Sequence, residues 1–75
     1  MSPLRQFWID EFLESYELWR DRCAGVRIAY ARWLESEPSD RTLTYAAYRT
    51  ALESEDQAAR LHQRCAERVA APAAA

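Results

Sequence analysis

The sequence contains few residues that interrupt or cross-link a chain. It has one glycine, three prolines and two cysteines in 75 residues. Because glycine and proline are the strongest breakers of regular structure, long segments can run without interruption. A chain this short buries only about 60% of the surface that its unfolded form exposes, so it needs a disulfide, a metal, a partner or very regular helix packing. We expect one domain.

The cysteines and the histidine do not form a metal-binding motif. Cys23 and Cys65 lie far apart in the chain, and His62 is the single histidine. A structural zinc site needs about four such ligands at close spacing. A di-iron bundle needs a glutamate three residues before its histidine, and Ala59 occupies that position. We therefore expect no metal, no cofactor and no catalytic role for His62, which we assign to a helix seam.

Basic residues are too few for a typical nucleic-acid-binding protein. Lysine is absent, and ten arginines stand against twelve acidic residues, which gives a net charge of −2. Nucleic-acid-binding proteins usually carry a strongly basic face. A short basic stripe does exist at Arg60, Arg64 and Arg68, but pairing with an acidic helix explains it more simply. We expect no nucleic-acid partner.

Long hydrophobic runs are missing as well. The longest ones are a few residues, whereas a helix that spans a bilayer needs roughly 20. The first residues lack the charged and apolar regions of a secretory signal. These features predict a cytoplasmic protein without a membrane partner, in which both cysteines are reduced thiols.

The first half of the chain has the spacing of one long helix. Ser2 followed by Pro3 is a favourable start, since serine suits the N-cap and proline the first helical position. Apolar residues then recur at alternating steps of four and three, a period of 3.5 that is typical of helices packed nearly parallel or antiparallel. The series is Phe12, Tyr16, Trp19, Cys23, Val26, Tyr30 and Trp33.

Gly25 leaves two interpretations open. It could end a first helix, which would give a three-helix bundle. Against this, no capping residue comes directly after it, and the alternating spacing continues through it without a change of phase. A glycine inside a helix costs only about 1 kcal/mol relative to alanine. We therefore predict one continuous helix over residues 3–36.

The second half of the chain predicts a turn and another helix. Pro38 disfavours helix at the residue before it, and Ser39, Asp40 or Thr42 can cap the second helix. We predict a turn over 37–41, a helix over 42–69, and a flexible tail rich in alanine and proline over 70–75. The seam of this helix is Tyr45, Tyr48, Leu52, Glu55, Ala59, His62, Ala66 and Val69.

Two long helices with a short connection make an antiparallel hairpin, which forms one domain over residues 1–69. With the turn centred near residue 38 or 39, residues whose numbers add to about 77 lie level. This register predicts four ion pairs between the helices: Glu17–Arg60, Glu14–Arg64, Asp10–Arg68 and Arg22–Glu55. It also separates Cys23 from Cys65 by about 16 Å along the hairpin, too far for a disulfide.

The aromatic content exceeds what the seam of one hairpin can bury. Three tryptophans, four tyrosines and two phenylalanines would leave apolar surface exposed, and such surface usually marks an interface. The sequence therefore predicts an all-α hairpin that dimerises into a four-helix bundle. We expect it to be a non-catalytic protein-interaction module, such as a regulator, an adaptor or an inhibitor. Its partner would be a second copy of itself or another helical protein. The predicted interface residues are Trp8, Phe12, Tyr16, Trp19, Val26, Tyr30, Trp33, Tyr48 and Leu52.

Two other functions remain open at the level of sequence. A small helical enzyme or anion-binding protein could use seam arginines such as Arg27 and Arg49, together with Tyr30 and Tyr48. A tight arginine cluster around an enclosed polar cavity would favour this alternative. The other is a redox switch that depends on the cysteine thiols, and it requires a change of oligomeric state on oxidation.

Overall fold

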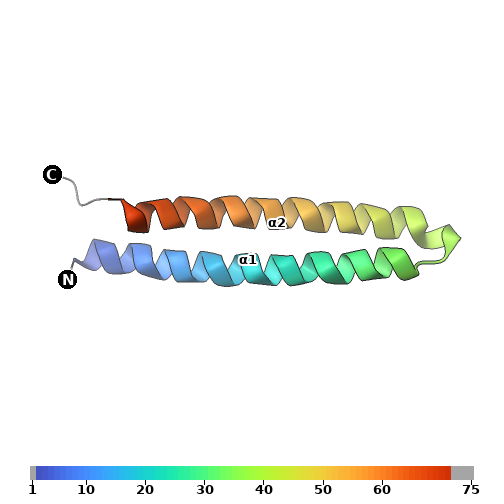
Figure 1. The fold of residues 1–75 in the computed structure, drawn as a ribbon, viewed down its shortest axis with the longest axis horizontal. Helices are drawn as coiled ribbons and strands as arrows, with labels where there is room; N and C mark the ends of the chain where they lie inside the picture. Colours follow the sequence, from blue (N-terminus) through green and yellow to red (C-terminus); the bar gives the residue numbers. More distant parts are fainter. Residues whose placement is uncertain (1, 72–75) are drawn as a thin grey trace.

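The computed structural model describes residues 2–71 and consists there of two long helices that run side by side in opposite directions (Figure 1). Helix α1 spans Pro3–Glu35, a short 3-10 turn η1 spans Pro38–Asp40, and α2 spans Arg41–Ala70. The all-α hairpin matches the sequence prediction: α1 begins at the predicted residue, and the other three helix ends are displaced by one residue. Of the predicted tail, Ala70 ends α2 and Ala71 comes after it, whereas residues 72–75 lie outside the described part of the chain.

Helix α1 is continuous through Gly25, so the three-helix alternative is wrong. The glycine has no positive φ angle, and a Cβ atom added to it would meet nothing within 4 Å. Helix therefore continues through this position without strain. The cost of about 1 kcal/mol is small compared with the packing that α1 gains on both sides of it.

The turn holds the two helices together through side-chain hydroxyls. Asp40 takes the N-cap position of α2, but its backbone is already helical and its side chain makes no capping hydrogen bond. Instead, the Thr44 hydroxyl lies 3.0 Å from Ser36 Oγ, and Ser36 donates a 2.7 Å hydrogen bond to the carbonyl of Trp33. The first turn of α2 is thereby tied to the last turn of α1.

Contacts between the helices confirm the predicted register. Ser15 lies opposite His62, with 3.0 Å between Oγ and Nδ1. Tyr30 lies opposite Tyr48, with ring centroids 5.4 Å apart. The numbers in these pairs add to 77 and 78. Cys23 and Cys65 are both free, as this register requires.

The four ion pairs predicted between the helices are wrong, although the register is right. Among the described residues, Arg60 pairs instead with Asp56 of its own helix at 2.9 Å, and Arg22 pairs with its neighbour Asp21 at 3.1 Å. The guanidinium of Arg68 lies over the ring of Trp8, 4.9 Å from its centre. An exposed ion pair gains at most about 1 kcal/mol, which is too little to bend long side chains across the hairpin.

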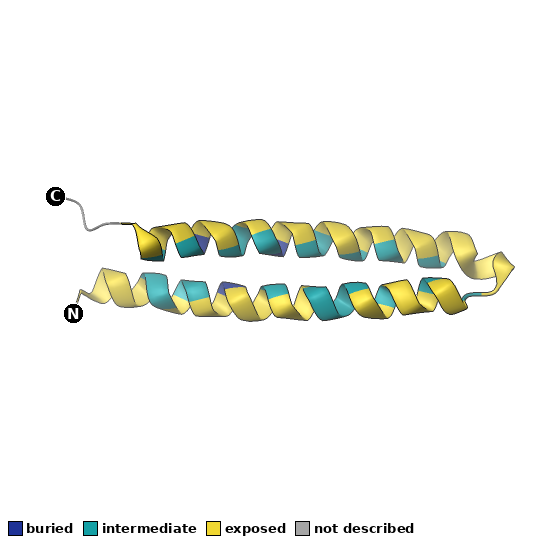
Figure 2. Cartoon of the chain, in the orientation of Figure 1, coloured by how far each residue is buried: buried dark blue, intermediate teal, exposed yellow. Residues whose placement is uncertain are grey.

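The hairpin is a single layer of helices with almost no core of its own. Its principal extents are 60 × 16 × 12 Å, and the outer sides of both helices are exposed (Figure 2). In the described residues, only Ala58, Cys65 and Ser15 are buried. Stable domains usually contain at least two packed layers around one core. None of the described helices is long and apolar enough to cross a membrane.

Candidate interaction surface

One broad side of the hairpin collects most of the aromatic rings. The buried line of α1 passes through Ser15, and the buried line of α2 passes through Ala58 and Cys65. Aromatic and apolar side chains of both helices border this line on the same side. We call this side the aromatic face, and it consists of Phe12, Tyr16, Trp19, Val26, Tyr30, Trp33, Tyr45, Tyr48, Leu52 and His62.

A first cluster on the aromatic face surrounds His62. The imidazole is stacked on Trp19 at 5.7 Å with an interplanar angle of 14°. Phe12 and Tyr16 lie against it at ring distances of 4.9 and 5.6 Å. His62 is thereby held by three rings of α1, which agrees with the seam position expected from the sequence. Trp19 Nε1 is buried beside it without a hydrogen-bond acceptor in the described residues.

The hydrogen bonds of Ser15 fix how His62 takes part in this cluster. The Ser15 hydroxyl donates to the carbonyl of Phe12 at 2.8 Å. Since a hydroxyl has one hydrogen, the contact with His62 requires Nδ1–H of the imidazole to donate to Ser15 Oγ. A nucleophilic serine would instead donate its proton to the histidine. The direction of these bonds suits a structural role that anchors α2 on α1.

A second cluster lies at the turn end of the aromatic face. Trp33 is stacked on Tyr48 at 5.4 Å and contacts Tyr45 at 4.9 Å. Tyr30 closes the group against both Tyr48 and Trp33, yet it remains 44% exposed. Aromatic pairs contribute about 0.5–1.5 kcal/mol each beyond area burial. The cluster both holds the helix ends together and presents ring surface outward.

The structure brings most of the predicted interface residues together. Phe12, Tyr16 and Trp19 meet around His62. Tyr30, Trp33 and Tyr48 contact one another at the turn end. Half-buried Val26 lies between these clusters along α1, and Leu52 lies on the exposed edge of α2. Trp8 lies apart, near the termini, against Phe7 and beneath Arg68.

The sequence prediction missed Ser15 and Tyr45 as members of these clusters. Their signals were present but ambiguous. Steps of four, three and four residues also connect Trp8, Phe12, Ser15 and Trp19. The buried line of α1 therefore has the same spacing as the neighbouring apolar series. A polar serine within that line gave no hydrophobic signal. Tyr45 precedes Tyr48 on α2, and its spacing predicts a seam position without indicating an interface.

The arrangement gives little support to the alternatives that depend on arginines or thiols. Arg27 and Arg49 are both exposed and do not converge on an enclosed cavity. The hydroxyl of Tyr45, and to a smaller extent the carboxylate of Glu53, raise the pKa of Arg49 above its ordinary value. Cys65 is only 1% exposed, which shields its thiol from oxidants, and Cys23 is half-buried.

Metal ligands do not converge either within residues 2–71, where no group of three or more His, Cys, Asp or Glu side chains could hold an ion. The aromatic face is therefore the candidate site. Comparison of the chain with protein-family models, with curated proteins and with solved structures gives no match.

Proposed function

We propose that the protein is a non-catalytic interaction module that pairs with a second copy of itself through the aromatic face to form a four-helix bundle. The observation that carries this proposal is the missing second layer. Within residues 2–71, the largest side chain that is fully buried is that of Cys65, although the chain has nine aromatic residues. A second hairpin laid on the aromatic face would enclose both ring clusters and supply the absent core.

The exposed area of the hairpin has the size that such a partner would cover. The chain exposes 5979 Å², whereas a compact protein of 8.7 kDa exposes about 4,700 Å². The excess of about 1,300 Å² per chain is above the ~800 Å² that each partner contributes to a standard interface. The radius of gyration is 17.3 Å, against about 11 Å for a compact chain of this length.

Charge along α1 favours a second copy as the occupant. Residues 3–21 contain five acidic and two basic side chains, whereas residues 22–35 contain three basic and one acidic side chain. If two hairpins pack with their turns at opposite ends, the acidic half of each α1 lies near the basic half of the other. A single two-fold axis between the hairpins then relates the two contacts between an acidic half and a basic half, as an isologous interface requires. The dimeric bundle, and not the single hairpin, would then act as the regulator, adaptor or inhibitor.

Two matched leucine variants test the proposal. Leu52, on the aromatic face, is 37% exposed, and Leu43, outside that face, is 73% exposed. Leu52→Glu should bury a charge between the two copies and shift the protein from dimer to monomer, because an unpaired charge is not tolerated in a desolvated interface. Leu43→Glu introduces the same charge on the same type of residue and should leave the dimer intact.

Molar mass measured by light scattering after size exclusion, with reductant and over a hundredfold concentration range, distinguishes the outcomes. Wild type and Leu43→Glu should give twice 8.7 kDa, and Leu52→Glu should give 8.7 kDa. A wild-type monomer that is fully helical by circular dichroism would refute self-association. The second layer would then have to come from a different helical protein.

A further inference from the structure

A groove runs between the two helices, away from the aromatic face. Three hollows of about 300, 230 and 150 Å³ succeed one another along it. Neighbouring hollows share lining residues, namely Arg22 and Ser54 at one junction and Leu18 and Leu61 at the other, so they form one continuous depression. Its limits on α1 are Glu11 and Ile28.

The groove has a floor of small residues between larger apolar walls. Gly25, Ala51 and Ala58 line the floor, and the space above Gly25 is open because an added Cβ would meet nothing within 4 Å. The side chains of Leu18 and Ile28 form the apolar wall beside this floor, and Ile28 is 53% exposed. Small residues let another backbone approach closely, and exposed apolar walls favour a partner with an apolar stripe.

A bundle built on the aromatic face would leave this groove open. Leu18 lies two residues after Tyr16, and two residues correspond to about 200° around a helix. On α2, Ser54 of the groove lies the same step after Leu52 of the aromatic face. The two surfaces are therefore on opposite sides of a single layer of helices, and one copy of the chain cannot cover both.

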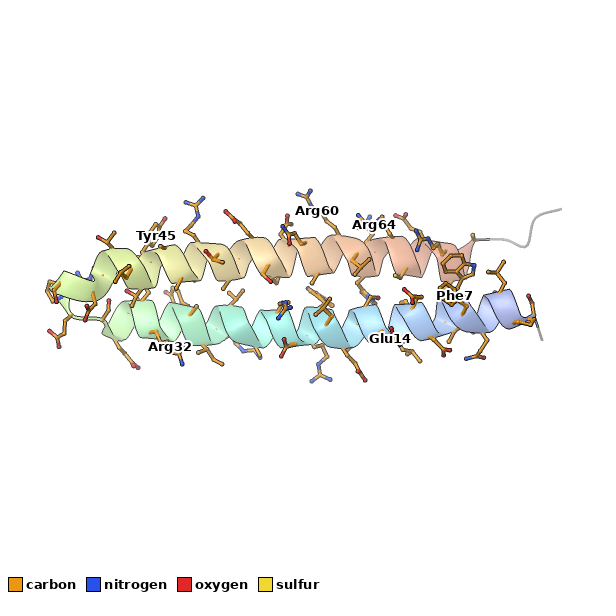
Figure 3. All side chains as sticks on the ribbon, turned by 180° about the vertical axis from the view of Figure 1, so that it is seen from behind. Phe7, Glu14, Arg32, Tyr45, Arg60 and Arg64 are labelled. Atoms are coloured by element: carbon orange, nitrogen blue, oxygen red, sulfur yellow. The ribbon has the colours of Figure 1, made fainter. Side chains whose placement is uncertain are left out.

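The charges that line the groove define the chemistry of its occupant. Glu11, Glu14 and Asp21 of α1 contribute to its lining, as does Arg22, which is paired with Asp21 at 3.1 Å. The lining side chains of α2 are uncharged. Figure 3 shows Glu14 on the α1 side of the hairpin and Arg64 on the α2 side, and neither takes part in an ion pair of the described residues. The α1 wall is therefore acidic and available for cations.

We propose that this groove binds one amphipathic helix of a different protein, with an apolar stripe on the floor and lysine or arginine along the edge that faces α1. The distance from Glu11 to Ile28 along α1 is about 25 Å, which corresponds to about 18 residues of a partner helix. The inference rests on the proposed function only in assigning the aromatic face to the second copy. The bundle would thus carry self-association on one surface and partner recognition on the other.

A labelled synthetic helix tests this inference on the full chain. The probe is an 18-residue peptide with leucine at helical spacing and lysine along one edge, and the control peptide has glutamate in place of each lysine. Fluorescence anisotropy should show binding of the lysine peptide, with the glutamate peptide about tenfold weaker because two or three favourable pairs become repulsive. Glu11→Gln with Glu14→Gln should reduce this difference, and added salt should do the same.

Gly25 provides the variant that blocks the groove and its matched control. Gly25→Phe places a ring in the open space and should weaken binding of the lysine peptide at least about tenfold, by steric exclusion. Gly25→Ala adds only a methyl group and should change it little. Circular dichroism is used to check whether both variants are helical, and molar mass shows whether they still dimerise.

The outcomes separate this inference from self-association. If the chain is monomeric and Gly25→Phe weakens its binding of the peptide, the groove is supported and the dimer is refuted, whereas a dimer that binds neither peptide refutes the groove alone. If Gly25→Phe abolishes the dimer while remaining helical, the groove belongs to the contact between copies, and the inference is overturned. Equal binding of the two peptides would overturn the charge assignment.

Discussion

At the scale of single residues, one of the three buried positions of the described seam is polar, namely Ser15. Ser15 and His62 connect the helices through a hydrogen bond that lies within a ring of aromatic side chains. Burying such groups is tolerated only when they are paired, so each residue depends on the other. The pair also limits the register, since a shift of either helix by one residue would separate them.

Removing one member of this pair should destabilise the fold more than removing both. Ser15→Ala leaves Nδ1–H of His62 without its acceptor, and we expect a loss of about 1–3 kcal/mol in the free energy of unfolding. Adding His62→Phe replaces the imidazole by an apolar ring among Phe12, Tyr16 and Trp19, and should recover part of that loss. Urea unfolding at fixed protein concentration measures both variants.

The exposed Ser39 is the control, because Ser39→Ala should change the free energy of unfolding by less than about 0.5 kcal/mol. Additive losses in the double variant would show that the two residues act independently and that their hydrogen bond contributes nothing to stability.

The periodicity of the sequence could not reveal this pair. Serine gives no apolar signal, and the partner of a seam histidine depends on the facing helix.

At the scale of elements, most of the fold can be explained by a few local signals. Pro3 and Pro38 lie near the ends of α1, and the unbroken spacing carries it through Gly25. The short turn then dictates an antiparallel register, which the aromatic contacts confirm. The ion pairs were predicted wrongly because register sets only the level of two residues along the hairpin. Whether long charged side chains meet also depends on their direction around each helix.

The turn-end cluster should stabilise its own part of the hairpin specifically. Trp33 contacts Tyr30, Tyr45 and Tyr48, so Trp33→Ala should cost about 3 kcal/mol and leave the facing rings without support. Hydrogen exchange should become faster for the backbone amides in the first turns of α2, because local opening there becomes easier. Amides near the His62 cluster should keep most of their protection.

Trp8→Ala is the counterpart at the other end of the hairpin, where Trp8 packs against Phe7. It should accelerate exchange near the termini and leave the turn protected. If either variant accelerates exchange equally along both helices, the hairpin opens as one cooperative unit and its clusters do not stabilise separate parts.

At the scale of the whole molecule, the shape limits how stable one chain can be alone. A layer 12 Å thick has almost no interior, and rings such as those of Tyr16, Tyr30 and Tyr45 remain exposed. The two large surfaces also differ in chemistry, with aromatic rings on one side and a narrow apolar groove with acidic residues on the other. That difference is what would allow a dimer to recognise a second protein without competition between the two contacts.

If the aromatic face joins two copies, folding and association should be coupled. The unfolding midpoint in urea should then rise with protein concentration, because each tenfold increase stabilises the dimer by about 1.4 kcal/mol relative to two unfolded chains. Far-ultraviolet circular dichroism over a hundredfold concentration range measures this dependence. Leu43→Glu should preserve it, whereas Leu52→Glu should remove it, since the variant unfolds as a monomer. A wild-type midpoint that does not change with concentration would mean that one hairpin is stable by itself, and that the aromatic face is reserved for another protein.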